Sequence, residues 1–291
     1  MTSTNVERLD RDRMPEASVA TVTRIGRTDK TVSVVIPAKN EARNLPHVLA
    51  DILADVHEVI LVDGNSTDDT VEVALRHRKD ILVIGQTRRG KGNALACGFA
   101  AASGEYIVMI DADGSTDPTE IPRFIAALDQ GADFAKGSRF LAGGGSSDIS
   151  RIRSVGNYFL NRIVNVVYGT HYSDLCYGYN AFRRECLDAM GLNVGESAAT
   201  GEREMLWGDG FEVETLINVR IAKAGLVVAE VPSFELKRRY GSSNLNAFSD
   251  GFRVLRTIHA ERRRGMDRGA SGRTAGEDRW TESPVAAEGA S

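Results

Sequence analysis

The sequence has little of several features that would place it in other protein classes. Only three of its 291 residues are cysteines (Cys97, Cys176 and Cys186), and the absence of a C-x-x-C pair argues against a disulfide framework or a zinc site. No apolar run approaches the roughly 18 residues that indicate a membrane span, and the polar N-terminus lacks the apolar core of a signal peptide. We therefore expect a protein that stays in the reducing cytoplasm.

An excess of basic residues is also absent. The chain has 36 Lys and Arg against 40 Asp and Glu, a net charge of -4, which argues against a general nucleic-acid partner. At about 100 to 200 residues per domain, the length allows one large domain or two small ones. Apolar residues are scarce at both ends. We predict a disordered N-terminal tail over 1–30, a folded domain over 31–258, and a basic, then disordered C-terminal tail over 259–291.

Between these ends, short apolar runs alternate with helical patterns. The runs are mostly apolar, and near-continuous apolar runs are typical of strands buried on both faces. Strands that alternate with helices indicate a parallel sheet covered by helices. The sequence therefore predicts an α/β domain with a mostly parallel central sheet. The runs are TVSVVIPA, EVILVDG, ILVIGQ, YIVMIDAD and ADFAKGSR.

Polar residues follow four of these runs, at the point where each predicted strand ends. In open α/β sheets, ligands bind at the carboxyl ends of the strands. Side chains from these four positions are therefore expected to share one site. They are Pro37 and Glu41 after the first run, Asp63 after the second, Lys91 in the basic TRRGKGNA segment after the third, and Asp111 and Asp113 after the fourth.

The pair Asp111 and Asp113 is the most informative of these groups. Residues two apart on an extended segment point to the same side, so two carboxylates are directed at one point. Two like charges at close range are unfavourable unless a cation lies between them or one is protonated. A hard divalent ion shared with substrate phosphates removes that repulsion. We therefore predict a Mg²⁺ or Mn²⁺ site that holds a nucleotide diphosphate, with the basic loop completing the anion site.

Other motifs have simpler interpretations. Asn44 before LPHVLADIL is typical of a helix N-cap, and we assign it no other role. Asp117 with Pro118 and Glu120 has the pattern of a capping box. Ser66 or Thr67 is expected to cap a helix after GNSTDDT, which leaves Asp63 available to a ligand. The RRGKG turn taken alone could also be a solvated basic loop.

Residues 31–258 resemble a family 2 glycosyltransferase of the GT-A fold, from the branch of dolichol-phosphate mannose synthase-like and polyprenyl-phosphate glycosyltransferases. The resemblance implies a metal-dependent, inverting transfer from a UDP- or GDP-sugar by one in-line attack. It also implies that Pro37, Glu41 and Asp63 bind the nucleoside. Lys91 would lie near the base or phosphates, and Asp111 and Asp113 would hold Mg²⁺ or Mn²⁺ on the donor diphosphate. The motifs are VSVVIPAKNEARNL, LVDGNSTDDT, RRGKGNAL, IDADGSTDP, KGSRF and EVPSFELKRRYGSSNL.

The chain departs from this family pattern at three places. Gly64 and Asn65 stand where many relatives have Asp-Gly, Ser115 where the mannose synthases often have Gln, and Asn244 where Lys is common. The first difference bears on the base contacts. The other two weaken the link to mannose more than the link to the enzyme class.

The acceptor decides which further residues are needed. A hydroxyl acceptor needs a general base, for which the WGDGFEVET segment offers Asp209, Glu212 and Glu214. A phosphate acceptor needs cations instead, since arginine binds phosphate in bidentate fashion. The candidate cations are Arg139, Arg151, Arg153, Arg238 and Arg239.

A polyprenyl phosphate is our first prediction for the acceptor, with Asp209, Glu212 and Arg238 as catalytic candidates. The alternatives are transfer to a hydroxyl of a saccharide or small natural product, and a regulator that binds a nucleotide sugar without catalysis. A nucleotidyltransferase is disfavoured, because it would be expected to have a Gly-rich loop with Arg after the first strand.

The last apolar pattern of the chain has two interpretations. Leu245, Phe248, Phe252, Leu255 and Ile258 recur at spacings of three or four, with arginines among and after them. Such a helix either packs on the domain or lies on a lipid surface as a basic amphipathic helix. The second interpretation predicts a peripheral membrane contact through 245–264.

Overall fold

A computed structural model describes residues 28–194, 205–241, 247–268 and 280–282, and in these ranges the predicted α/β fold class is confirmed. The central sheet has the strand order β10-β8-β5-β7-β4-β1-β2-β3. Neighbouring strands are parallel except that β7 runs antiparallel to both β4 and β5. The strands are β1 (Val32–Ala38), β2 (Glu58–Asp63), β3 (Leu82–Gly85), β4 (Tyr106–Met109), β5 (Phe134–Ser138), β7 (Asn180–Arg183), β8 (Val228–Pro232) and β10 (Trp280–Glu282).

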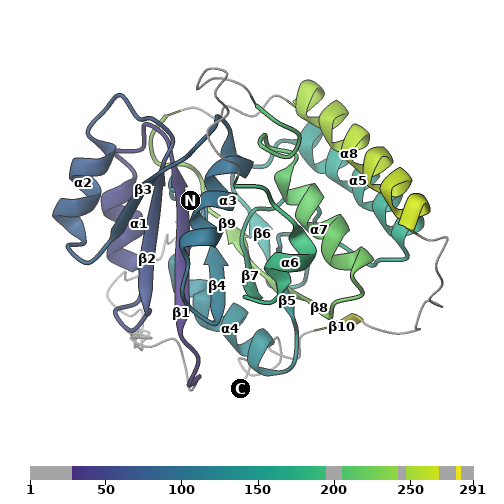
Figure 1. Cartoon of the computed structure of the whole chain (residues 1–291), viewed down its shortest axis with the longest axis horizontal. Coiled ribbons are helices and arrows are strands. Elements are labelled where there is room, and N and C mark those ends of the chain that lie inside the picture. The colour runs from purple at the N-terminus through teal and green to yellow at the C-terminus, as the bar shows by residue number, and fades with distance from the viewer. Residues whose placement is uncertain (1–27, 195–204, 242–246, 269–279, 283–291) are drawn as a thin grey trace, which may run out of the picture.

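Helices cover both faces of the sheet (Figure 1). The alternation within β1 produces this arrangement, because Val34 and Ile36 face one hydrophobic cluster while Val35 faces the other. The first cluster includes residues of α1 (Leu45–Asp51), α2 (Thr70–His77) and α4 (Ile121–Asp129). The second includes residues of α3 (Lys91–Ala101), α5 (Arg151–Tyr168), α6 (Cys186–Met190), α7 (Val213–Lys223) and α8 (Ala247–Arg268).

The strand register brings the predicted polar residues to one edge of the sheet. Ala38 at the end of β1 pairs with Asp63 at the end of β2, and Asp63 pairs with Gly85 of β3. On the other side of β1, Val35 pairs with Met109, so that the segment after β4 also leaves the sheet here. Two short strands, β6 (Gly145–Ser146) and β9 (Phe234–Glu235), form a separate parallel pair.

Regular elements extend beyond the bounds of 31–258 that the sequence predicts for the domain. Helix α8 continues to Arg268, ten residues past the predicted end at 258, and Trp280–Glu282 adds a strand beside β8. At the other end, Thr28 and Lys30 already contact Asp129 and Glu105 of the domain. Residues 1–27 and most of the predicted C-terminal tail lie outside the described residues. In the part of the chain that the structure describes, no helix combines the length and apolar character needed to cross a bilayer.

Candidate active site at the carboxyl edge of the sheet

Asp111 and Asp113 follow β4 and face away from the core. Ala112 between them is buried, whereas the side chains of Asp111 and Asp113 are 29% and 13% exposed. The chain forms a turn at Ala112 and Asp113, rather than the extended segment from which the sequence pattern predicted this pair. Asp113 also accepts a hydrogen bond from the backbone amide of Ser115 at 2.9 Å, which orients its carboxylate.

Lys91 at the start of α3 connects Asp111 to α7. Its Nζ lies 2.7 Å from Asp111 Oδ1 and 2.8 Å from Glu214 Oε1. Burial alone would lower the pKa of Lys91, but the two carboxylates outweigh burial and raise that pKa above its ordinary value. Burial also raises the pKa of Glu214, and Lys91 partly offsets this rise. Lys91 therefore stays charged beside Asp111.

Arg238 makes a matching connection to Asp113. Its Nη2 lies 2.6 Å from Asp113 Oδ2 and its Nη1 lies 3.1 Å from Glu41 Oε1. Burial raises the pKa of Glu41, and Arg238 and Asn44 partly offset this rise. Arg238 and Glu41 were predicted for separate roles, as catalytic and donor-binding residues. The structure instead brings both into one cluster with the metal candidate Asp113.

Residues 236–241, here called the strap, carry Arg238 across the edge of the sheet. The amide of Leu236 donates to the Ser115 carbonyl at 2.8 Å. Farther along, Tyr240 is held at its amide and its carbonyl by the side chain of Asn44, at 3.1 and 3.2 Å. The guanidinium of Arg43 covers the Tyr240 ring at 4.1 Å. The strap is thus fixed at both sides of Arg238.

Asn44 stands at the N-cap position of α1 as predicted, but the expectation that it has no other role is wrong. Its side chain makes no cap hydrogen bond to α1 and instead binds Tyr240 and Glu41. The cap predicted at Asp117 is confirmed, since its side chain accepts from the Thr119 amide in a short 3-10 helix (Pro118–Glu120). Glu120 does not complete the predicted capping box. Its carboxylate instead accepts from the Ser233 hydroxyl and the Phe234 amide.

The loops after β1 and β2 interlock through asparagines in left-handed conformation. Asn40 and Asn65 both have φ of 57°, a region that few residues other than glycine and asparagine adopt readily. Asn40 Oδ1 accepts from the Thr67 amide at 2.7 Å, and the Asn40 amide donates to Ser66. Asn65, which stands where the family pattern has glycine, therefore adopts a conformation that glycine also adopts readily. Asn65 belongs to the first departure from the family pattern, the one expected to affect contacts with the nucleotide base.

Asp63 and Pro37 occupy the nucleoside side of the predicted site. Both carboxylate oxygens of Asp63 accept from the Ser66 amide at 3.3 Å, so that this residue also shapes its own turn. Pro37 lies within β1 opposite Val62 and is partly exposed. A nucleoside contact for either residue stays a prediction.

Gly178 is a site residue that the sequence analysis missed. A Cβ at this position would lie 3.1 Å from Lys91 Nζ, 3.3 Å from Glu214 Oε1 and 3.6 Å from Asp111 Oδ2. Any side chain here would enter the carboxylate and lysine cluster. A single glycine between two tyrosines gives no signal of this kind, because the cluster forms only when α3, α7 and the end of β4 meet.

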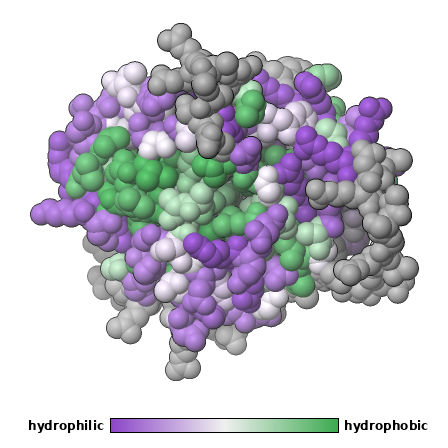
Figure 2. All heavy atoms as spheres, in the orientation of Figure 1, coloured by the Kyte–Doolittle hydropathy of each residue, from purple (hydrophilic) through white to green (hydrophobic). Residues whose placement is uncertain are grey.

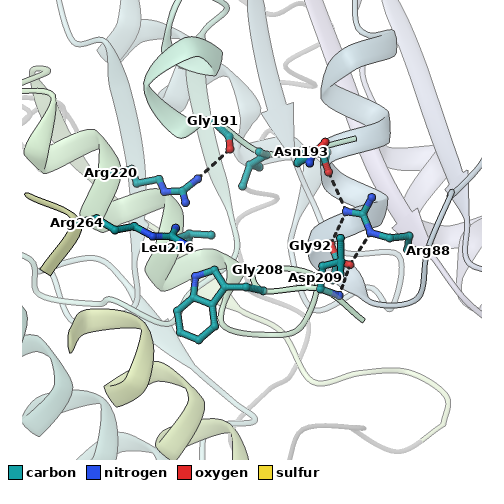
Figure 3. Close-up of a pocket in the computed structure, with 13 residues that line it drawn as sticks. Arg88, Gly92, Gly191, Asn193, Gly208, Asp209, Leu216, Arg220 and Arg264 are labelled. Carbon is teal, nitrogen blue, oxygen red and sulfur yellow. Dashed lines mark hydrogen bonds and ion pairs between the residues drawn. The ribbon is translucent and has the colours of Figure 1, made fainter. Parts of the chain in front are cut away.

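Asp209, predicted as a base, lies in a buried ion pair. Arg88 binds both of its carboxylate oxygens, with Nε to Oδ2 at 2.8 Å and Nη2 to Oδ1 at 2.9 Å. The same guanidinium donates to the Asn193 carbonyl (Figure 3) and to the Val194 carbonyl. The interpretation of RRGKG as a solvated loop is therefore wrong for Arg88, although Arg89 is exposed.

The glycines of this basic loop serve packing. A Cβ on Gly90 or Gly92 would lie 2.0 Å from the Asp209 carbonyl or 1.8 Å from the Gly208 carbonyl. The Gly92 amide also donates to the Asp209 carbonyl at 2.8 Å. Two backbone segments therefore meet here without side chains between them. The cavity of about 400 Å³ drawn in Figure 3 is lined in part by Gly92, Gly208 and Asp209. Asp111 and Asp113 are not among its lining residues.

Glu212 differs from both of its acidic neighbours. Its Oε1 accepts from the Gly208 and Gly210 amides at 3.2 and 3.4 Å. Its Oε2 is buried and has no hydrogen-bond partner among the described residues. Among the candidate bases, Glu212 thus has a buried oxygen without a hydrogen-bond partner in the described part of the chain.

The predicted acceptor arginines do not form one group. Arg139 is partly buried and binds Asp174 in bidentate fashion, at 2.7 and 2.9 Å, as well as Glu235 at 3.0 Å. Its donors are engaged within the fold, so we withdraw it from the acceptor set. Arg151 and Arg239 are exposed, and Arg153 is partly buried. Of the five, Arg238 is the one that the structure connects to Asp113.

The pair of Arg88 and Asp209 gives a first prediction. Arg88→Ala is expected to lower the free energy of unfolding by about 3 to 5 kcal/mol, because it leaves the Asp209 carboxylate buried and uncompensated. The double variant Arg88→Met/Asp209→Leu removes both charges and should recover most of that loss. Urea unfolding of the three proteins measures both effects. Equal stability of Arg88→Ala and the parent protein would contradict the structural role.

The donor atoms at the edge fit a hard divalent cation. Asp111 and Asp113 place two partly exposed carboxylates one residue apart at this edge, each next to a cation of the cluster. Carboxylates in ones or twos, completed by substrate phosphates, are typical ligands of Mg²⁺. Consistent with that incomplete protein shell, the described residues contain no group of three or more His, Cys, Asp or Glu side chains that could hold a metal ion.

Three comparisons place these observations among known proteins. The model of the family described as glycosyl transferase family 2 matches residues 33–191. Glycosyltransferase AglJ of Haloferax volcanii is 31% identical over 227 residues, which is 77% of this chain and 69% of that protein. Polyprenol monophosphomannose synthase of Mycolicibacterium smegmatis is 31% identical over 230 residues, 75% and 82% of the two chains. The chain spans about half the length of some other curated relatives that it matches.

A solved structure has a similar fold. Glucosyl-3-phosphoglycerate synthase from Mycobacterium tuberculosis, in complex with Mn²⁺, UDP-glucose and phosphoglyceric acid, superposes with a TM-score of 0.61. The two sequences are 25% identical, and the match covers 80% of each chain. The GT-A fold expected from the sequence motifs is thereby confirmed.

Proposed function

Because the chain belongs to glycosyl transferase family 2 and is a glycosyltransferase, we propose that it transfers a sugar from a nucleotide-sugar donor to a polyprenyl phosphate. The reaction would depend on a divalent metal and would invert the anomeric centre. The relative named polyprenol monophosphomannose synthase supports this acceptor class. The relative solved with Mn²⁺ and UDP-glucose supports the metal and the donor class.

The observation that carries the proposal is the linked cluster of acids and cations after β4. Lys91 and Arg238 each bridge one aspartate of the pair to a second acid. Asp111 and Asp113 would hold Mg²⁺ or Mn²⁺, which when bound would stabilise negative charge on the departing diphosphate. Lys91 stays charged and next to Asp111, where it adds fixed positive charge beside that leaving group.

Arg238 would serve the acceptor or the leaving diphosphate. In the described state it is held by Asp113 and Glu41, both of which the proposal assigns to donor binding. When donor and metal engage these two acids, the guanidinium is released toward the phosphate groups. Two fork-shaped N–H pairs then suit a phosphate oxyanion.

The state of the candidate bases favours a phosphate acceptor. A phosphate is already an anion and needs no proton removed, whereas a hydroxyl needs a positioned base. Asp209 is held by Arg88 and Glu214 by Lys91, so neither is placed to accept a proton. Transfer to a hydroxyl of a saccharide or small natural product stays the second candidate, because Glu212 Oε2 has no partner among the described residues.

Glu212→Gln separates these two functions. For a phosphate acceptor, the variant should keep turnover within about tenfold of the parent, whereas loss of a general base costs about a hundredfold or more. Purified protein is assayed with a panel of UDP- and GDP-sugars, with undecaprenyl phosphate or soluble sugars as acceptors, and with Mn²⁺, Mg²⁺ or a chelator. Transfer to a soluble hydroxyl that Glu212→Gln abolishes, with no reaction on the lipid, would refute the proposed acceptor. No turnover with any donor would favour a binding protein.

A further inference from the structure

The outer side of α5 exposes a row of large apolar side chains. Ile152 is 66% exposed, Phe159 61% and Val166 77%, with Val155 and Ile163 exposed between them. The five positions recur at spacings of three, four, four and three, which places them along one stripe of the helix. We call these five residues the ridge.

The opposite side of the same helix accounts for its packing. Asn157, Asn161 and Val164 are buried, and the two asparagines bind Asp174, Leu175 and the Ser173 carbonyl. The folded domain therefore needs the polar side of α5 and not the ridge. Large apolar side chains gathered on an exposed helix face mark an interaction surface.

Helix α8 lies beside α5 and widens this surface. Tyr168 at the end of α5 donates to the Ile258 carbonyl at 2.7 Å, while Val254 and Ile258 of α8 are buried. Phe252 is 71% exposed and Leu255 43% exposed. The predicted apolar face of 245–264 is thus divided, because Ile258 packs inward, whereas Phe252 and Leu255 face out. Leu245 and the side chain of Phe248 lie outside the described residues.

Among the described side chains, the exposed charges of α5 and α8 are positive. Arg151 and Arg162 are exposed on α5, and α5 contains no acidic residue. Arg262 and Arg263 are exposed on α8, where the buried Glu261 is engaged by Arg220 and Lys223. Two copies meeting through this surface would set arginines against arginines. An anionic surface would neutralise them.

We propose that the ridge of α5, with its arginine rim, is the face by which this protein docks on an anionic lipid bilayer. Apolar side chains flanked by arginines are the composition of helices that lie in the membrane interface. The position also suits a lipid acceptor. Helix α5 begins a short loop after β6, and β6 pairs with β9, whose chain continues into the strap that carries Arg238. The docking face and the candidate site are therefore joined through a few residues.

The test is vesicle co-sedimentation of the full chain without donor or acceptor, so that its outcome is independent of the proposed function. Vesicles of phosphatidylcholine with about 30% phosphatidylglycerol are compared with phosphatidylcholine alone, at low and high salt. The parent protein should bind the anionic vesicles, and salt should weaken the binding. No preference for anionic vesicles overturns the proposal.

Three variants locate the surface. Phe159→Ser/Val166→Ser removes two ridge side chains and should weaken binding at least about tenfold, because each buries apolar area in the interface. Arg162→Gln/Arg263→Gln should weaken it about twenty-fivefold, at about fivefold for each arginine near an anionic surface. The matched control Leu75→Ser/Leu82→Ser/Arg76→Gln removes exposed side chains of the same kinds from the α2 and β3 side, where Figure 2 shows another apolar area, and should leave binding unchanged.

Two other occupants of the ridge would give different results. If a second copy covers it, the parent protein sediments as a dimer that Phe159→Ser/Val166→Ser converts to a monomer, with no loss of vesicle binding. If another part of the same chain covers it, this variant lowers the melting temperature by several degrees, at roughly 2 to 4 °C for each kcal/mol lost in a domain of this size. Either result overturns the proposal.

Discussion

Asp113→Asn is expected to reduce sugar transfer about a hundred- to a thousandfold, and Asp111→Asn by a similar factor. Each substitution removes a charge that the proposed metal site needs where the diphosphate departs, and losing one such electrostatic element costs about a hundred- to a thousandfold. Both residues are partly exposed at a strand end, and their cations keep a second partner in Glu214 or Glu41. The free energy of unfolding should therefore change by less than about 1 kcal/mol.

Asp117→Asn is the matched control for this pair. It makes the same chemical change four residues farther along, at a side chain that caps a 3-10 turn, and asparagine caps about as well as aspartate. Turnover should stay within about threefold of the parent value. Titration with Mn²⁺ in the presence of nucleotide supplies a second readout, which Asp111→Asn and Asp113→Asn should abolish. If either variant turns over normally at saturating metal, the assignment of the metal ligands is wrong.

Much of the fold could be predicted from the sequence because both faces of the sheet are covered. A short, mostly apolar segment such as EVILVDG is typical of a strand buried on both faces. The alternation of such strands with helices predicts the parallel pairing around β1. The later strands carry weaker signals. β7 has four residues and runs antiparallel, while β10 arises from a polar segment that pairs with β8 at the edge of the sheet. Hydrophobic pattern does not encode that kind of pairing.

The candidate site was predictable in its residue types but not in its contacts. Asp111 and Asp113 follow from spacing within one strand end, whereas the bond from Arg238 to Glu41 joins residues 197 apart in the chain. Arg88 and Arg89 are adjacent and chemically identical, yet one is buried against Asp209 and the other is solvated. Which arginine turns inward depends on where the 208–209 backbone meets α3. That meeting has no local sequence signal.

The double contact of Arg238 sets two opposing demands on this residue. As a cation next to Asp113 and Glu41, it stabilises the acids when metal and donor are absent. The same charge competes with a metal ion for Asp113. If the residue also contacts phosphate during transfer, it should help turnover while hindering metal binding. A residue with a purely structural role would neither raise turnover nor hinder metal binding. Measuring metal affinity and turnover together therefore separates a catalytic role from a structural one.

Arg238→Ala is accordingly expected to lower turnover about a hundredfold while tightening Mn²⁺ binding at least about fivefold. The loss of turnover is that expected when one electrostatic contact to the transition state is removed. The tighter Mn²⁺ binding corresponds to about 1 kcal/mol of repulsion removed beside Asp113. Arg238→Lys keeps the charge without the fork and should fall between the parent and Arg238→Ala in both measurements. Lys237→Ala, an exposed neighbour on the strap, serves as the control. If Arg238→Ala weakens Mn²⁺ binding and leaves turnover intact, Arg238 only fastens the strap, and the acceptor phosphate must be bound by other cations.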